Sequence, residues 1–489
     1  MKPTEQQQAI IENKEDRAIV MARAGTGKSS TAVMFIENRP EIDFLYTVFN
    51  TDAKKDMELK VKKKGLKNVK VSTAHSVAFG PIVPSNGYEI TPSLKATDII
   101  EIIPLLKKKL KIDRTGTFIL AKHIIDFYNI FLSSSEKNVY NLDPSNYILA
   151  SKDYINIIQD SAKLLYTKMD KGEMPVLHDF YLKKFAHNTP VLNYDYIILD
   201  EGQDSNHVLA DILLNQPSKL LILGDSAQNI YSFRNTVNLF DELDWPSYPL
   251  TESFRFHQGI ADMANETLDY YKLLDPNYKN EYPVIGKAKK INEKQYKKDP
   301  LMHIGRTNGS LLDKAIDSIE DGMEYLHFTG SPKSVIFGSG STNIYDIYNL
   351  YTNNKTKIRD PFISSIGSFE DLEDYIEDVN DREIGRLAKT VKRYKRKLPM
   401  LIKQLQESDT KYDRAEIGFA TTFKSKGLGF SKVKVMSDHV NPEDIILEME
   451  AVNKSTDEHF KKRKLTELRT EINTKYVAVT RGMQEVSYE

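Results

Sequence analysis

The sequence has no cysteine, almost no net charge and no long apolar run. The absence of cysteine from its 489 residues excludes disulfides, thiol catalysis and cysteine-ligated zinc, and it is typical of a reducing compartment. No apolar stretch reaches the roughly 18 residues of a membrane-spanning helix, and the polar, acidic N-terminus is unlike a signal peptide. With 68 basic and 69 acidic residues, nucleic-acid binding would have to use a local groove and not a globally basic surface.

The residues that are present predict a globular α/β protein. A hydrophobic fraction of 40% is enough to form cores, and the length fits about two to four domains. Apolar runs at 18–21 and 44–49, with a helix-like stretch at 31–36 between them, predict a βαβ unit and hence a parallel sheet.

The pattern then changes twice along the chain. Residues of about 82–190 predict a helical insertion, after which strand-like runs return at 196–199 and 220–223. A second α/β region begins near residue 250, and helical periodicity marks a basic stretch at 381–406, for which a solvated helix face is the plainer interpretation. The strands expected in this second region lie near 302–305, 325–328, 433–435 and 476–479.

Residues 22–29, Ala-Arg-Ala-Gly-Thr-Gly-Lys-Ser, lie between an expected strand and an expected helix. That is the context of a phosphate-binding P-loop, in which glycines let backbone N–H groups approach phosphate oxygens at a helix N-terminus. Lys28 would reach the β- and γ-phosphates and Ser29 would hold Mg²⁺. An ordinary glycine-rich turn is the alternative. The candidate nucleotide-binding residues are Ala24, Gly25, Thr26, Gly27, Lys28 and Ser29.

Polar groups at the ends of later strands complete this interpretation. Asp200 can help to position Mg²⁺ and Glu201 can polarise the attacking water. Gln228, after the run 220–223, could sense the γ-phosphate, and Arg255 and Arg481 could supply positive charge to it. Each has a plainer alternative, namely a helix cap, a tight turn or a surface ion pair, so their joint occurrence with the P-loop carries the argument.

In this order the motifs resemble those of superfamily 1 helicases of the UvrD/Rep type, and they look closest to the F-box DNA helicase subgroup, without any F-box segment. The resemblance runs from Thr4 to Glu485 and is weakest at about 85–190 and 430–470. Each motif alone is moderately specific, whereas seven or more in one order are highly specific.

The nucleotide motifs of the family imply roles for particular residues. PTEQQQAII resembles the Q motif, with Gln6 as the best match to the glutamine that reads adenine and Gln7 as the alternative. The P-loop resembles A-x-A-G-[ST]-G-K-[ST], and LDEGQD is similar to DExQD. LTESFRF resembles the motif that implies Phe254 on the adenine face and Arg255 at the γ-phosphate, and YVAVTRG implies Arg481 as an arginine finger.

Other motifs imply a path for single-stranded DNA. They are VFNTDAKKDM, VSTAHSVAF, GDSAQNIYSFRNT and TTFKSKGLGF. Base stacking would fall to Phe233, and such stacking is worth roughly 1–3 kcal/mol per base. The alternatives are strand-end caps, a buried histidine and core aromatics. The implied DNA contacts are Asn50, Thr73, His75, Tyr231, Phe233, Thr421, Lys424 and Lys426.

The sequence also departs from the family pattern. Phe423 replaces a histidine and Gly429 replaces the glutamate associated with the nucleotide sugar, which puts sugar recognition and some coupling in doubt. Ser253 stands where asparagine is usual and Gly482 where alanine is usual. MHIGRTN looks like the segment with the Arg-x-Asn signature, here Arg306 and Asn308.

The resemblance implies two RecA-like lobes with ATP in the cleft between them. The expected division is 1–82 with 190–249 for lobe one, 83–189 for its helical accessory insertion and 250–489 for lobe two, with a reduced insertion at about 340–410. The implied function is an ATP- and Mg²⁺-dependent 3′→5′ DNA helicase or single-strand translocase acting in repair, recombination or replication. Its partners would be single strands and junctions with duplex.

Three alternatives remain open from the sequence: a translocase that strips proteins from single strands, a subunit that gates a partner such as a nuclease, and RNA as the track. We expect a monomer that binds no membrane, in the cytoplasm of a bacterial or phage-infected cell.

Overall fold

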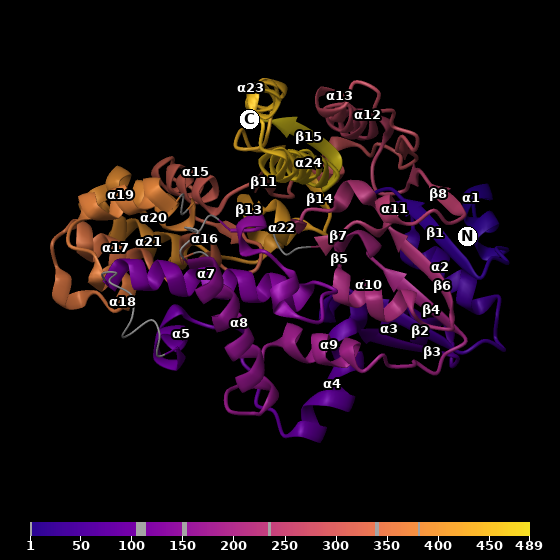
Figure 1. The fold of residues 1–489 in the computed structure, drawn as a ribbon. Coiled ribbons are helices and arrows are strands. Elements are labelled where there is room, and N and C mark those ends of the chain that lie inside the picture. Colours follow the sequence, from indigo (N-terminus) through magenta and orange to yellow (C-terminus); the bar gives the residue numbers. More distant parts are fainter. Residues whose placement is uncertain (1, 104–113, 149–153, 233–235, 338–341, 380–381) are drawn as a thin grey trace.

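The computed structural model describes residues 2–103, 114–148, 154–232, 236–337, 342–379 and 382–489. The structure has two larger parallel sheets, one at the right of Figure 1 and one near its centre, and helices pack around both. The predicted fold class, an α/β protein with two parallel sheets and helical insertions, is confirmed.

The first sheet has six parallel strands in the order β3-β2-β4-β6-β1-β8. Its inner strands β2 and β4 are buried along their whole length, which is why their sequences are apolar runs without alternation. The strands are β1 (Arg17–Ala22), β2 (Phe44–Val48), β3 (Val69–Thr73), β4 (Tyr196–Asp200), β6 (Lys219–Gly224) and β8 (Ser247–Leu250).

Short helices flank this sheet and several have side-chain caps. Thr4 and Gln7 form a capping box at the start of α1, and Asn50 caps α3. Phe35 of α2 packs edge-on against Phe44 and Tyr196, which stack on each other across neighbouring strands. The helices are α1 (Glu5–Ile11), α2 (Lys28–Glu37), α3 (Thr51–Lys64) and α10 (His207–Leu214).

Between β3 and β4 the chain forms a group of helices, as the apolar periodicity predicts. Their buried side chains share one core with those of β4 and α10. Lys183 lies inside this core and donates to the carbonyl oxygens of Phe131 and Ser134. The helices are α4 (Ala74–Asn86), α5 (Ala96–Ile102), α7 (Arg114–Ser133), α8 (Ile155–Asp170) and α9 (His178–His187).

The second sheet has five parallel strands in the order β12-β13-β11-β14-β15. Helices α12 (Gln258–Leu268) and α15 (Asn308–Glu320) pack against it. The strands are β11 (Leu301–Gly305), β12 (Leu326–Phe328), β13 (Ile417–Thr421), β14 (Phe430–Val435) and β15 (Gly482–Tyr488). Two-residue strands elsewhere are β5 (Ser205–Asn206), β7 (Thr236–Val237), β9 (Glu252–Ser253) and β10 (Ile285–Gly286).

One predicted strand is wrong. Residues 476–479 are the last turn of the helix α24 (Glu458–Val479), and the strand that follows is β15. The four apolar residues continue a helical series of buried side chains through Leu468 and Ile472, and a short apolar run does not by itself distinguish a strand from a buried helix. Arg481 therefore follows a helix and not a strand.

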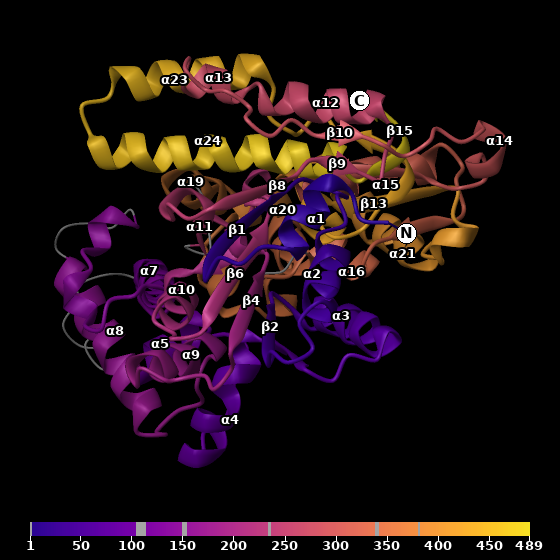
Figure 2. The same ribbon diagram turned by 90° about the vertical axis from the view of Figure 1, so that its right-hand side faces the viewer.

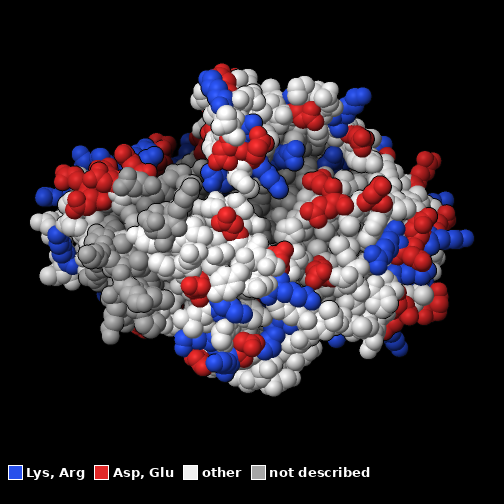
Figure 3. All heavy atoms as spheres, viewed as in Figure 1, with Lys and Arg blue, Asp and Glu red and all other residues white. Residues whose placement is uncertain are grey.

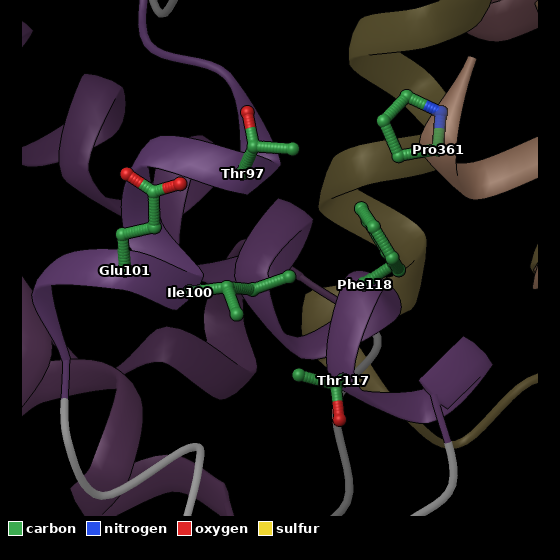
Figure 4. Close-up of a pocket in the computed structure, with 6 residues that line it drawn as sticks. All are labelled: Thr97, Ile100, Glu101, Thr117, Phe118 and Pro361. Atoms are coloured by element: carbon green, nitrogen blue, oxygen red, sulfur yellow. The ribbon is translucent and has the colours of Figure 1, made fainter. Parts of the chain in front are cut away.

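A second group of helices lies between β12 and β13 and packs on α15. It meets the first group where Phe118 of α7 contacts Phe362 edge-on at 5.9 Å. A cavity of about 260 Å³ opens there, with Ile100, Phe118 and Pro361 among its walls (Figure 4). The helices are α16 (Pro332–Phe337), α17 (Ile344–Tyr351), α18 (Pro361–Ser365), α19 (Phe369–Val379), α20 (Arg382–Tyr394) and α21 (Leu398–Glu407).

Helices α23 (Pro442–Lys454) and α24 form a long hairpin beside the second sheet (Figure 2). Ile445 of α23 packs against Leu468 and Ile472 of α24, and the free end of the hairpin projects from the same side of the molecule as α7 and α8. In the part of the chain that the structure describes, no helix is both long and apolar enough to cross a membrane.

A buried histidine at the centre of the second sheet is expected to make the stability of the fold sensitive to acid. His303 of β11 is 2% exposed, and burial, with Lys314 and Lys434 nearby, lowers its pKa from 6.5 to about 4. Between these values the unfolded chain binds a proton that the folded chain does not, so stability is lost as the pH falls from 6.5 to 4, by up to about 3 kcal/mol. His303→Leu is expected to reduce the difference in Tm between pH 7 and pH 5. An unchanged difference would show that other groups set the acid limit.

Candidate functional site

The loop between β1 and α2 has the backbone of a phosphate cradle. Gly25 and Gly27 adopt left-handed conformations with φ of 76° and 82°, and a Cβ atom on Gly25 would lie 2.5 Å from the Cβ of Arg255. Gly27 starts α2 without a side-chain cap. The first amide groups of α2 are therefore available to an anion, as at other helix N-termini.

Lys28, the first residue of α2, contacts the carboxylates at the end of β4. Its Nζ lies 2.9 Å from Oδ1 of Asp200 and 2.7 Å from Oε1 of Glu201. Burial opposes the charged form, but Asp200 and Glu201 outweigh it and raise the pKa of Lys28. The P-loop lysine is thus fully charged at the place where phosphate oxygens would be received.

Glu201 is held in an unusual conformation. Its φ of 59° is left-handed, which is rare for a residue with a side chain. Its Oε2 accepts a hydrogen bond of 2.6 Å from Nε2 of Gln203. Burial would raise the pKa of Glu201, but Lys28 and Lys426 outweigh it and hold the pKa at about 2. Glu201 is therefore an ionised acceptor at neutral pH.

Oxygen donors suited to Mg²⁺ lie next to Lys28. Asp200 accepts a hydrogen bond of 2.8 Å from the hydroxyl of Tyr46, which fixes the carboxylate, and Ser29 is half-buried in the first turn of α2. Over the described ranges there is no cluster of three or more acidic or histidine side chains that could hold a metal by itself. One hydroxyl and one carboxylate fit a Mg²⁺ ion that takes its other ligands from water and phosphate.

Gln228 belongs to a buried network around Asp225. The Nε2 of Gln228 donates to Asp225 at 2.8 Å, and the same carboxylate accepts from Arg23 at 3.0 Å and from the hydroxyl of Tyr476 at 3.2 Å. Sequence reasoning missed Arg23 and Tyr476. Arg23 occupies the free position of the P-loop pattern and Tyr476 was assigned to a strand, so only the fold reveals them.

Two arginines from the second half of the chain approach the P-loop. Arg481 is 1% exposed and donates to the carbonyl oxygens of Val477 and Leu428, whereas Arg255 donates to that of Thr480 at 3.2 Å. Neither forms an ion pair with a described residue. Burial lowers the pKa of both, and the charge of Arg255 further lowers that of Arg481. A buried and a half-buried guanidinium group, neither with a carboxylate partner among the described residues, are a strong site for an anion.

The residues expected near the adenine occupy one side of this loop. The Nε2 of Gln6 donates to Oγ1 of Thr251 at 3.0 Å, and the backbone N–H of Thr251 donates back to Gln6 at 2.9 Å. Gln7 is the buried one of the pair, and a Cβ on Gly27 would lie 3.1 Å from its Nε2. The ring of Phe254 is 45% exposed, as a surface for a base requires. Which glutamine would read the base stays a prediction.

The predicted DNA contacts Asn50, Thr73 and Thr421 lie at the ends of β2, β3 and β13. Each caps the following helix with its side chain, which is the plainer role expected for the first two. His75 is half-exposed and its Nε2 lies 3.1 Å from Asp179, so it is not a fully buried histidine. Their contact with DNA stays a prediction.

A series of rings connects the two sheets. Phe49, after β2, stacks on Tyr231 at 5.5 Å, and Tyr231 lies 5.9 Å from Phe423, after β13. The guanidinium of Arg306 lies 5.0 Å from the ring of Phe423 and pairs with Glu471 at 2.7 Å. Phe423, the departure from the family pattern, is therefore accommodated by packing. Phe233 lies outside the described residues.

The two lysines of the KSKG segment differ in environment. Lys424 is exposed to solvent. Lys426 is 11% exposed, forms an ion pair with Asp204 and donates to the carbonyl oxygen of Gln228 at 2.8 Å. Lys426 thus joins the segment after β13 to the segments after β4 and β6, and its predicted contact with DNA stays a prediction.

The parallel sheets, the glycine loop before α2 and the carboxylates at the end of β4 define a P-loop nucleoside-triphosphatase fold. Residues 3–240 match the model of the UvrD/REP helicase N-terminal domain. This part of the chain is therefore similar to the N-terminal domain of UvrD/REP helicases, and the resemblance predicted from the motifs is confirmed.

Relatives of the chain carry helicase names. It is 26% identical over 471 residues to F-box DNA helicase 1 of Gallus gallus, covering 90% of this chain and 45% of that protein. It is 30% identical over 292 residues to F-box DNA helicase protein 1 of Schizosaccharomyces pombe, covering 54% and 32%, and 24% identical over 293 residues to ATP-dependent DNA helicase Rep of Buchnera aphidicola, covering 54% and 44%. The chain spans less than half the length of these relatives.

Proposed function

We propose that this protein is an ATP-dependent DNA helicase that translocates on single-stranded DNA. The observation that carries the proposal is the meeting of Lys28 at the carboxylates of β4 with Arg255 and Arg481 from the other half of the chain. Three cations from the two halves of the chain around one glycine loop are what a triphosphate requires. The proposal of DNA helicase activity is also supported by the names of the similar proteins, which are DNA helicases.

The residues divide the chemistry of hydrolysis among them. Lys28 and the N-terminus of α2 bind the phosphates, and Glu201, ionised and fixed by Gln203, orients and polarises the attacking water. Ser29 and Asp200 would hold Mg²⁺, which neutralises phosphate charge. Arg255 and Arg481 stabilise the charge of the transferred phosphoryl group from the opposite side.

Hydrolysis would drive movement because ATP joins groups from both sheets. ATP favours their approach, and loss of the γ-phosphate removes the charge that holds Arg255 and Arg481, so the sheets separate. We propose the division into lobes at 1–82 with 190–249, 83–189 and 250–489, with the smaller insertion within 340–410. We also propose 3′→5′ polarity and a monomeric enzyme of DNA repair, recombination or replication.

A second candidate function is displacement of proteins from single strands, alone or with a partner such as a nuclease. The small second helical group, α16 to α21, favours it, because little protein is available there to hold duplex. Comparison of strand displacement with removal of a protein bound to the same DNA separates the two functions.

Lys28→Ala is expected to abolish ATP hydrolysis on every track, because it removes the cation at the phosphates. Wild-type protein is expected to hydrolyse ATP faster with single-stranded DNA than without it. The measurement is steady-state hydrolysis without nucleic acid, with single-stranded DNA and with RNA of the same sequence.

Exposed Lys62 of α3 gives a matched control, since Lys62→Ala removes one lysine far from the P-loop. Equal stimulation by RNA and DNA would contradict the assignment of DNA as the track. Little hydrolysis by wild-type protein on any track would contradict an autonomous motor and favour the partner-gated alternative.

A further inference from the structure

Lys426 lies between β13 and β14 of the second sheet, but its ammonium group contacts residues that follow β4 and β6 of the first. It pairs with Asp204, donates to the carbonyl oxygen of Gln228 at 2.8 Å and lies 4.9 Å from the centre of the Tyr231 ring. Its side chain is 11% exposed and that of Asp204 is 1% exposed. A lysine so enclosed is poorly placed to contact a DNA backbone.

The partners of Lys426 lead directly to the catalytic carboxylate. The Nε2 of Gln203, a fully buried residue, lies 2.6 Å from Glu201 and 3.3 Å from Asp204. The other end of the same amide accepts from the backbone N–H of Asp225 at 3.1 Å. Gln203 therefore has one orientation, in which its NH₂ group faces both carboxylates.

Lys426 is the one cation within ion-pair distance of Asp204 among the described residues of this cluster. Asp200, Glu201 and Asp204 supply three carboxylates, and Lys28 and Lys426 are the cations within ion-pair distance. One oxygen of Asp204 is buried without a hydrogen-bond partner. Without Lys426, Asp204 would be a buried charge beside Glu201 with no counterion, which is strongly unfavourable.

When ATP binds, the orientation of Glu201 is expected to depend on this arrangement. Lys28 is the residue that the phosphates are expected to engage, so it would turn part of its charge away from Glu201. Gln203 then remains as the hydrogen-bond donor that orients Glu201, and Lys426 and Asp204 keep Gln203 in place.

We infer that Lys426 is a positioning residue for ATP hydrolysis, which through Asp204 and Gln203 makes the placement of Glu201 depend on contact between the two sheets. The inference rests on the proposed ATP hydrolysis, and it goes beyond it by naming the contact that conveys the position of the second sheet to the catalytic base. DNA held between the sheets would act on hydrolysis through this contact.

Lys426→Met is expected to lower kcat for ATP hydrolysis by roughly 10- to 100-fold, the loss typical of a misplaced catalytic group. KM for ATP and Kd for single-stranded DNA are expected to change by less than about threefold, below 1 kcal/mol. Lys426→Arg, which keeps the charge, is expected to recover much of the rate. Asp204→Asn is expected to lower kcat in the same direction, and the double variant to lose less than the product of the single losses.

Controls separate this role from DNA binding and from folding. Lys462 of α24 is exposed and forms no ion pair with a described residue, so Lys462→Met is expected to keep wild-type rates. If Lys426→Met raised the Kd for DNA but kept the wild-type kcat at saturating DNA, Lys426 would be a DNA contact and the inference would be overturned. A wild-type kcat in Asp204→Asn would also overturn it. Asp204→Asn serves as the test if Lys426→Met does not fold. Rates of ATP hydrolysis are measured with and without DNA. If DNA did not stimulate hydrolysis by wild-type protein, the proposed motor would be contradicted, but the rates without DNA would still test the role of Lys426.

Discussion

Arg481→Ala is expected to lower kcat for ATP hydrolysis by about 10³- to 10⁵-fold, the effect of losing an arginine finger, while Kd for nucleotide changes little. The structure gives the reason, because Arg481 is buried beside Arg255 and forms no ion pair with a described residue. Its described hydrogen-bond acceptors are two carbonyl oxygens and one hydroxyl, so an anion that enters the site would be its direct counterion. Steady-state hydrolysis and binding of a fluorescent nucleotide measure the two quantities.

The same variant separates a catalytic role from a structural one. A buried cation without a counterion adds little to stability, so Tm is expected to stay level or rise in Arg481→Ala. Arg469→Ala, at an exposed position of α24, is the matched control with normal rates. Normal turnover by Arg481→Ala would mean that another arginine, Arg255 first, is the finger.

Glu201→Gln is expected to lower kcat by about 10²- to 10⁴-fold, the contribution of a general base. The amide has nearly the same shape and can still accept a hydrogen bond from Lys28 or Gln203, but it cannot take a proton from water. Binding of ATP is expected to persist, so single-turnover measurements should show bound ATP that is converted slowly to ADP.

A carboxylate far from the loop provides the comparison for this variant. Exposed Glu89 lies between α4 and α5, and Glu89→Gln is expected to hydrolyse ATP at the wild-type rate. Retention of the wild-type rate by Glu201→Gln, with loss in Asp200→Asn, would transfer the role of base to Asp200.

The P-loop and its carboxylates were predictable because their chemistry depends on neighbours in sequence. A glycine-rich turn with a lysine, between a strand and a helix, is the sequence context of a phosphate loop, and buried strands such as β4 and β6 show as apolar runs. The helical insertions were predictable for the same reason, since amphipathic periodicity is a local signal.

The contacts between distant segments could not be predicted. Lys426 and Asp204 are 222 residues apart and Tyr476 and Asp225 are 251 apart, and no local pattern records such pairs. The helical end at 476–479 was mistaken because four apolar residues fit either period. The choice between Gln6 and Gln7 depends on a turn of α1, which sequence spacing does not resolve.

The hairpin of α23 and α24 would amplify a movement of the second sheet, so the movement can be measured at the hairpin. Its longer helix, with 22 residues, is about 33 Å long, so a small rotation of the second sheet moves its free end much farther than the ATP cleft. Because the chain has no cysteine, cysteines placed at Leu447 on the hairpin and at Leu59 on α3, which are 68% and 67% exposed, would be the only thiols in the protein. Fluorophores on that pair would report opening and closing of the motor in real time, one molecule at a time.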